Sequence, residues 1–168
     1  VVAVTGYTGV YDATPHGASG TVTGVTGDLA AAGSSLNLGS SYTDFPGGTA
    51  HWTFNGGTNY LDEAGDVAID ISKAVANILV NGYTGTFDAA PHGATLASAT
   101  GVAGADLSAS VTVGSETFTN APGGSVAWSF ANNNYAPQNG TADIVINKAD
   151  AVVAVTGYTG VYDATPHG

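Results

Sequence analysis

The segment PGGTAHWTF at residues 46–54 returns as PGGSVAWSF at residues 122–130, and this pair decides the fold class. In the first copy, the apolar side chains of Ala50, Trp52 and Phe54 occupy every second position. Such alternation gives a β-strand one apolar face and one polar face. The Pro-Gly-Gly sequence that opens each copy is typical of a turn. We therefore expect the same half-buried strand, entered from a turn, twice in the chain.

The two copies belong to a longer internal repeat. DVAIDISKA at residues 66–74 corresponds to DIVINKA at residues 143–149, and Lys73 and Lys148 lie 75 positions apart in these segments. The repeat divides the chain into three parts: a first unit over residues 1–74 (unit one), a second over 75–149 (unit two), and the first strand and turn of a further unit over 150–168.

Alternate copies agree better than neighbouring ones. Residues 152–168 match residues 1–17 at all 17 positions, whereas residues 77–93 match them at only 10. This difference indicates an array of two alternating unit types with a period of 151 residues, because residue 152 corresponds to residue 1. We expect the chain to be a segment of such an array within a longer protein.

Further strand patterns fill each unit. VVAV at residues 1–4 and NILV at 77–80 are apolar and β-branched, and Val67, Ile69 and Ile71 alternate with polar residues. Turn residues interrupt these patterns roughly every 8–12 positions, as in β-sandwiches. Only GDLAAAG at residues 27–33 suggests a helical turn. The prediction is an all-β fold of tandem small Ig-like β-sandwiches, about 75 residues each, with a β-grasp arrangement as the alternative.

The composition argues against several classes of partner. Thirteen acidic residues against two lysines give a formal net charge of −11. With so few cationic side chains, we expect neither nucleic acid nor an anionic membrane surface as a partner. The chain has no cysteine for disulfides or thiolate metal sites. It also has no run of about 20 apolar residues for membrane insertion, and we expect a signal or anchor, where one exists, outside these residues.

The combination of motifs resembles the MBG-type bacterial repeat domains, the YGX or YDG group. The resemblance covers nearly the whole chain. It implies Ig-like modules strung in tandem in very large secreted or cell-surface proteins, many of them presumed adhesins, and it brings no catalytic residues. The motifs that carry it are GYTGVYDATPHG, VTGVTGDL, SYTDFPGGTAHWTF and GDVAIDISKA in the first unit, and GYTGTFDAAPHG, TGVAGADL, TFTNAPGGSVAWSF and ADIVINKA in the second.

The Asp–His pair within GYTGVYDATPHG is the first candidate site. Asp12 and His16, repeated as Asp88 with His92 and Asp163 with His167, could orient one another as a carboxylate and a base do. No nucleophile elbow accompanies them. The sequence D-A-x-P-H-G instead predicts a turn in which the aspartate caps backbone N–H groups and the glycine adopts a positive φ. We therefore expect no enzymatic activity, no catalytic residues and no cofactor.

Other side chains suggest weaker candidates. Asp62, Glu63 and Asp66 could supply oxygens to calcium, and calcium between units remains an alternative to a metal-free chain. We expect Trp52 and Trp128 to pack in the cores rather than to stack on sugars.

Two further pairs of side chains have more than one possible role. Tyr7 and Tyr11 share one strand face and either clasp the junction between units or form an exposed ridge. A lysine–asparagine isopeptide bond is a further alternative for Lys73 and Lys148.

Two functional hypotheses follow. In the first, the chain is part of an extracellular stalk or fibre, because SKAVAN at 72–77 and NKADAV at 147–152 leave almost no flexible linker. Its partner is then the chain itself: neighbouring repeats, or copies joined by strand pairing of residues 150–168, which we expect to pack on unit two or on another copy. In the second, the units bind glycans or cell-surface proteins through loops 55–66 and 131–141.

Overall fold

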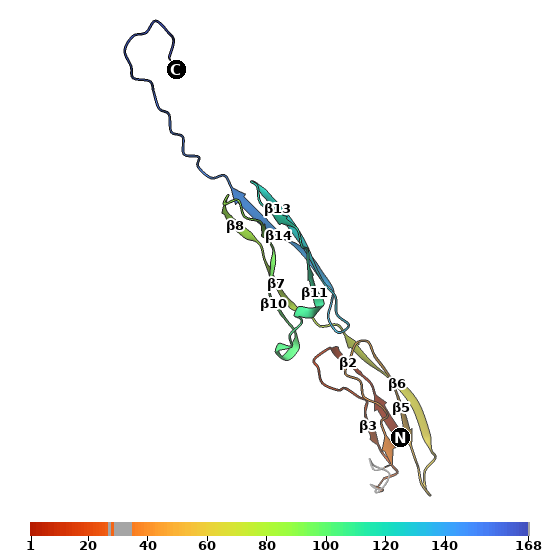
Figure 1. Ribbon diagram of the computed structural model, residues 1–168. Coiled ribbons are helices and arrows are strands. Elements are labelled where there is room, and N and C mark those ends of the chain that lie inside the picture. Colours follow the sequence, from red (N-terminus) through yellow and green to blue (C-terminus); the bar gives the residue numbers. More distant parts are fainter. Residues whose placement is uncertain (27, 29–34, 168) are drawn as a thin grey trace.

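The computed structural model describes residues 1–26, 28 and 35–167, and it confirms the all-β fold class. Two β units lie end to end in one elongated body, and a C-terminal segment leads away from it (Figure 1). The sheets form a sandwich-like arrangement in each unit, and the described residues contain no α-helix. The predicted helical turn falls largely outside the described residues. No helix described here has the length and apolar character needed to cross a membrane.

The described residues of unit one form two sheets. One contains β1 and β3, which run antiparallel, and the other has the order β2-β6-β5-β4. In the larger sheet, β2 lies parallel to β6, and the other pairs are antiparallel. The strands are β1 (Val2–Thr5), β2 (Tyr7–Val10), β3 (Ser19–Val22), β4 (Leu36–Asn37), β5 (Gly47–Phe54) and β6 (Glu63–Ser72).

Gly6 lets the chain pass from one sheet to the other between β1 and β2. A Cβ atom at this position would overlap the carbonyl oxygen of Ala68 on β6, so the two backbones approach closely only with glycine. Gly82 makes the same crossing in unit two, where a Cβ would overlap the carbonyl oxygen of Asp143. This close approach explains why each GYTG motif opens with glycine. At this residue the chain leaves the smaller sheet and enters the larger one.

Unit two repeats this topology and adds a short antiparallel sheet of β9 and β12. Its larger sheet has the order β11-β13-β14-β8, with β8 parallel to β14, and β7 pairs with β10. Two short 3-10 turns, Val102–Gly104 and Ser108–Ser110, precede β11. The strands are β7 (Asn77–Asn81), β8 (Tyr83–Thr86), β9 (His92–Gly93), β10 (Thr95–Thr100), β11 (Val111–Val113), β12 (Thr117–Phe118), β13 (Gly123–Phe130) and β14 (Gln138–Asn147).

The alternating strands place their apolar faces in the cores, as the sequence predicts. Phe54 and Phe130 are buried at the ends of β5 and β13. Trp52 and Trp128 lie on the same faces but are half-buried, packed against the clusters that contain these phenylalanines. The largest fully buried side chains are Phe130, Ile69, Ile144 and Val126.

Residues 150–167 form no strand, and their side chains are exposed. Of the two places expected for this segment, packing on unit two is therefore wrong, and packing on another copy stays a prediction. The segment points away from both units (Figure 1). The reason lies in the pairing pattern of unit two. The positions beside β10 and β14 that a first strand occupies are already filled by β7 and β8. Unit two therefore has no vacant place for a second copy of this strand.

Candidate functional site

The Asp–His pair forms a local turn. The Asp12 Oδ1 atom accepts hydrogen bonds from the Thr14 backbone N–H at 2.9 Å and from the Thr14 hydroxyl at 2.7 Å, and it lies 2.9 Å from His16 Nε2. The hydrogen bond from the Thr14 hydroxyl, followed by the one with His16, lowers the pKa of Asp12 from 3.8 to about 2. The predicted aspartate cap is present. The positive φ, however, lies at Ala13, at 65°, rather than at the glycine.

This turn lacks the geometry of a catalytic triad. In a triad, the two ring nitrogens of histidine face different partners. Here the same nitrogen, His16 Nε2, faces both Asp12 Oδ1 and, at 3.2 Å, Thr14 Oγ1. Unit two keeps the Asp88–His92 contact at 3.0 Å but has Ala90 in place of the threonine. The recurring element is thus the turn and not a nucleophile.

The two tyrosines of the motif have different roles. Tyr7 stacks on His16 with ring centroids 3.9 Å apart, and its ring also covers Gly9, where a Cβ would overlap the phenol. Tyr11 instead reaches unit two and makes an edge contact with Tyr135, with centroids 5.5 Å apart. Of the two alternatives for this pair, clasping the junction describes Tyr11, whereas Tyr7 belongs to the turn.

The junction between the units is held first by the backbone. Ala74, in the link between β6 and β7, pairs with Tyr135 in a parallel bridge. The Ala74 N–H donates to the Asn134 carbonyl at 2.9 Å, and the Ala136 N–H donates to the Ala74 carbonyl at 2.8 Å. Ala74 and Ala76 are each only 5% exposed. The link is therefore an integral part of unit two and not a flexible linker.

Asparagine side chains of unit two then fasten the turn before β5. The Phe45 N–H donates to Asn134 Oδ1 at 3.0 Å, and Asn134 Nδ2 donates to Asp44 Oδ1 at 2.7 Å. Asn133 Nδ2 donates to the Phe45 carbonyl at 3.3 Å. These contacts join residues about 90 positions apart, so they hold the turn at residues 44–45 of unit one against the loop 132–136 of unit two.

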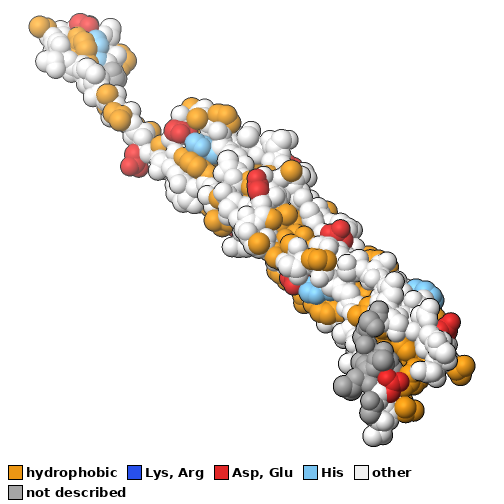
Figure 2. Space-filling view, turned by 90° about the horizontal axis from the view of Figure 1, so that it is seen from below, with side chains coloured by type: hydrophobic (Ala, Val, Ile, Leu, Met, Phe, Trp, Pro, Cys, Tyr) orange, Lys and Arg blue, Asp and Glu red, His pale blue; other side chains and the backbone are white. Residues whose placement is uncertain are grey.

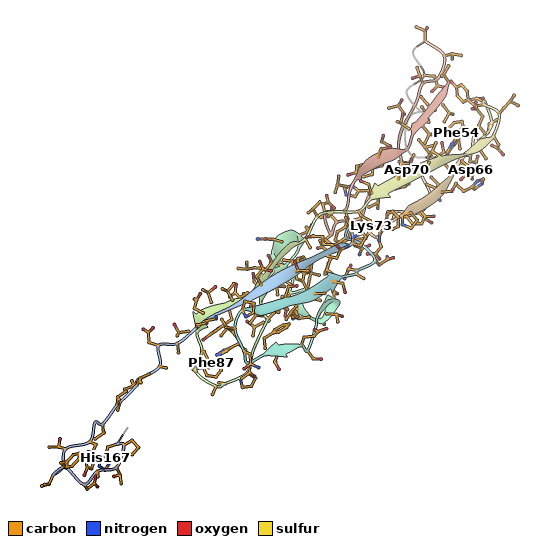
Figure 3. The ribbon with its side chains drawn as sticks, turned by 90° about the horizontal axis from the view of Figure 1, so that it is seen from above. Phe54, Asp66, Asp70, Lys73, Phe87 and His167 are labelled. Atoms are coloured by element: carbon orange, nitrogen blue, oxygen red, sulfur yellow. The ribbon has the colours of Figure 1, made fainter. Side chains whose placement is uncertain are left out.

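Lys73 lies between the units (Figure 3). Its Nζ atom donates to the Asn132 backbone carbonyl at 3.2 Å and lies 4.9 Å from the centre of the Phe45 ring, a cation–π contact. This lysine thus has a role in holding the junction. Its Nζ atom thus donates to a backbone oxygen and not to the carboxamide that an isopeptide bond would need.

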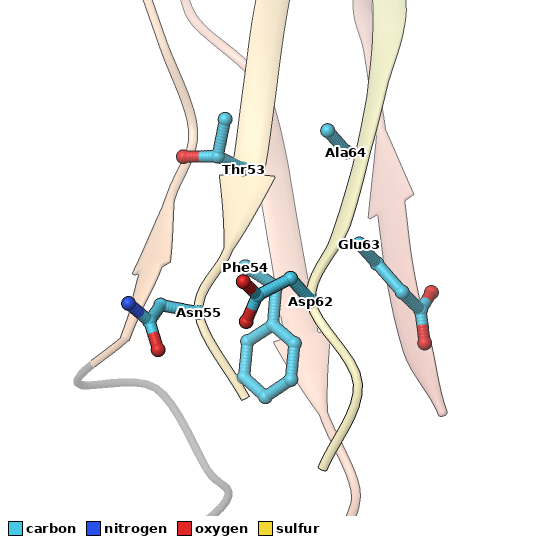
Figure 4. A pocket seen from close by; sticks show the side chains of 6 residues that line it. All are labelled: Thr53, Phe54, Asn55, Asp62, Glu63 and Ala64. Carbon is cyan, nitrogen blue, oxygen red and sulfur yellow. The ribbon is translucent and has the colours of Figure 1, made fainter. Parts of the chain in front are cut away.

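The proposed calcium ligands lie at the distal end of unit one, the end farther from unit two, but do not converge. The Asp62 carboxylate accepts the Gly56 N–H at 2.8 Å, whereas Asp66 pairs with His51 at 2.8 Å. Asp62 and Glu63 line a hollow of ≈ 400 Å³ beside Phe54 (Figure 4), with their carboxylates pointing in different directions. Within the described ranges, no three acidic or histidine side chains are grouped as metal ligands are.

The sequence did not reveal the role of the Asn132–Asn134 run or of Phe45. One signal was available, because the two units differ at most of these positions. Unit one has Gly57 and Thr58 where unit two has Asn132 and Asn133, and unit two has Ala121 where unit one has Phe45. Asn134 gives no such signal, because its counterpart is Asn59. The binding hypothesis gives loop 131–141 a role in ligand recognition. Residues 132–136 of this loop instead contact unit one and the link between the units.

Comparison with known proteins adds no assignment: the chain matches no protein-family model and no curated protein.

Proposed function

We propose that this chain is a structural segment of a long extracellular bacterial fibre, filament or adhesin stalk, in which it acts as a semi-rigid spacer. One observation carries the proposal, namely the junction between the units. A link of four residues, 73–76, is paired with a loop of the next unit, and side chains from both units close around it. A spacer needs such fixed angles between successive modules, because its task is to keep its ends apart.

The surface agrees with a passive role. Figure 2 shows one elongated body with acidic side chains scattered along the visible face. Charged residues make up only 9% of the chain. The Asp–His turn recurs with its local hydrogen bonds even in the exposed segment, where Asp163 Oδ1 lies 2.9 Å from His167 Nε2. A motif that forms equally inside and outside a unit suits a repeated structural element.

The resemblance to MBG-type repeats supports the secreted or cell-surface location and the array. The partner in this proposal is the chain itself, through neighbouring repeats or copies along the fibre. Electron microscopy of the native assembly tests it. Long beaded fibres with a repeat of two small domains would support the proposal, whereas isolated particles would count against it.

Binding of glycans or cell-surface proteins is the competing proposal. Of the two loops predicted for this role, 55–66 and 131–141, the second makes contacts at the junction through residues 132–136. Loop 55–66, with Asp62 and Glu63 beside the hollow at Phe54, is therefore the binding surface in this proposal. A glycan-array screen of the chain separates the two. Reproducible, saturable binding that is lost on substituting Asp62 would favour an adhesin module, and an absence of binding would favour the spacer.

A further inference from the structure

Three asparagines of the chain are followed directly by glycine: Asn55, Asn81 and Asn139. Asparagine is a chemically labile residue, and a following glycine makes it more so, because glycine has no side chain to shield its backbone nitrogen or restrict its conformation. In deamidation, this nitrogen attacks the asparagine carboxamide and closes a five-membered ring. The backbone must turn to close the ring, so the reactivity of each pair depends on the structure that holds it.

Two of the three pairs are held in strands. Gly140, the residue after Asn139, lies inside β14 opposite Trp128 of β13. Asn81 ends β7 and lies opposite Thr95 of β10. Pairing with a neighbouring strand keeps the backbone extended at both places. These two asparagines are therefore protected from ring closure while unit two is folded.

The third pair, Asn55 and Gly56, lies in the loop that follows β5, and the Asn55 side chain is exposed. This side chain folds back along the chain, because its Oδ1 atom accepts the Gly57 N–H at 2.9 Å. Gly57 has a positive φ of 62°, which glycine adopts without strain. A hydrogen bond to this oxygen draws electron density from Cγ, the atom that the glycine nitrogen attacks. The carboxamide is thus exposed, turned toward the next peptide group and polarised.

One contact holds the attacking nitrogen in place. The Gly56 N–H donates to Asp62 Oδ1 at 2.8 Å, so its hydrogen points at this carboxylate and not at the Asn55 carboxamide. Ring closure puts Cγ of Asn55 where that hydrogen lies, because the nitrogen stays planar. The hydrogen bond to Asp62 must therefore break before the ring can form. Figure 4 shows the Asp62 carboxylate turned toward Asn55 and the Glu63 carboxylate turned away.

We propose that Asn55 is the deamidation site of the folded chain and that Asp62 sets its rate. When the Gly56 N–H leaves Asp62, the nitrogen gives its proton to solvent and forms a bond to Asn55 Cγ. The carboxamide nitrogen then leaves as ammonia, and water opens the ring at either of its carbonyl groups. Position 55 ends as aspartate or isoaspartate. The net reaction consumes a water molecule and releases ammonia, and it needs no other reagent.

The product alters the distal loop of unit one. Both forms add a negative charge beside Asp62 and Glu63, and isoaspartate also lengthens the backbone by a methylene group directly after Phe54. Unit two has Ala131 at the corresponding position, so the same change cannot occur there. The inference goes beyond the spacer function and does not depend on it.

Peptide mapping of the full chain after incubation at neutral pH tests the site. Trypsin cleaves after the two lysines and so separates peptide 1–73, which holds Asn55, from peptide 74–148, which holds the other two pairs. Each deamidation adds about 1 Da. The folded chain is expected to gain this mass in peptide 1–73, at residue 55, while peptide 74–148 stays unchanged. The chain unfolded in urea is the reference and is expected to gain mass in both peptides.

Asp62→Ala tests the role of the carboxylate. Loss of a hydrogen bond to a charged group is expected to speed deamidation at Asn55 about tenfold. Asp62→Asn keeps an oxygen acceptor but loses the charge, and it is expected to speed the reaction only about twofold. Glu63→Ala is the matched control and is expected to leave the rate unchanged, because this carboxylate points away from Asn55.

Tryptophan fluorescence and the mass of peptide 74–148 report whether each variant keeps its fold. Where Asp62→Ala does not, Asp62→Asn carries the test and must react faster than Glu63→Ala. Deamidation of the folded chain in peptide 74–148 as fast as in 1–73, or none in 1–73 even with Asp62 replaced, would overturn the site. A rate at Asn55 that is unchanged in the Asp62 variants, or slower as the loss of a general base would make it, would overturn the role of Asp62.

Discussion

Replacing Asn134 with alanine removes a side chain that makes two hydrogen bonds across the junction. Its Oδ1 accepts the Phe45 N–H at 3.0 Å, and its Nδ2 donates to Asp44 Oδ1 at 2.7 Å. A neutral hydrogen bond contributes about 1 kcal/mol to stability, and one to a charged group about 1.5–3 kcal/mol. Because Asp44 is exposed, the lower end applies to the second bond. The substitution is therefore expected to weaken the coupling between the units by about 2.5 kcal/mol.

This loss falls on the unit that unfolds first, because junction contacts vanish when either unit unfolds. For a domain of 60–100 residues, 1 kcal/mol corresponds to roughly 4–8 °C in Tm. The first transition is thus expected to fall by roughly 10–20 °C. Thermal unfolding followed by tryptophan fluorescence measures it, since Trp52 reports on unit one and Trp128 on unit two. Replacing either tryptophan with phenylalanine isolates the other signal.

Asn59→Ala is the matched control. Asn59 precedes Tyr60 as Asn134 precedes Tyr135, but it is exposed at the distal end of unit one. Surface substitutions of this kind change stability by less than about 0.5 kcal/mol. Equal effects of the two substitutions, within that margin, would refute the assignment of Asn134 to a stabilising junction.

Two further predictions concern the repeated motif. Gly6→Ala is expected to destabilise unit one by several kcal/mol, because the new Cβ would overlap the Ala68 carbonyl oxygen. Gly157→Ala is the control, since a Cβ at this position has no atom within 4 Å. Differential scanning calorimetry is expected to show a lower melting temperature for the first variant and an unchanged one for the second. Asp12 is expected to titrate near pH 2 when its carboxyl group is followed by NMR. Its pKa in the folded chain is lower than the value of 3.8 expected for the unfolded chain. The Asp12 carboxylate therefore stabilises the fold above pH 3.8, and this contribution is lost as the pH falls through about 2. A midpoint near 3.8 would contradict the hydrogen-bonded turn. A lowered pKa is also expected at Asp163, whose carboxylate accepts a hydrogen bond from the Thr165 hydroxyl.

Features encoded within a few residues could be predicted from the sequence. The alternation of Ala50, Trp52 and Phe54 gave the strand and its buried face, because side chains along a strand point to opposite sides. The aspartate cap of the turn was equally predictable. The positive φ was expected at the glycine that ends the motif but lies at Ala13, because the turn is closed by the Asp12 carboxylate two residues earlier.

The junction could be predicted only in part. The short link and the position of Tyr11 suggested it, but the contacts of Asn133 and Asn134 with Phe45 join residues 88 and 89 positions apart. Such contacts depend on how two units meet, and no local pattern encodes that. The exposed state of residues 150–167 likewise follows from strand positions already filled in unit two, which only the pairing of β7 and β8 reveals.

The central claim is that the junction fixes the two units relative to one another. Spin labels at Thr49→Cys and Ser125→Cys, exposed and equivalent positions on β5 and β13, allow the inter-unit distance to be measured by pulsed electron paramagnetic resonance. The account predicts a single narrow distance distribution, which broadens when Asn134→Ala is added. A broad distribution in the unaltered chain, as two domains on a flexible linker would give, would contradict it.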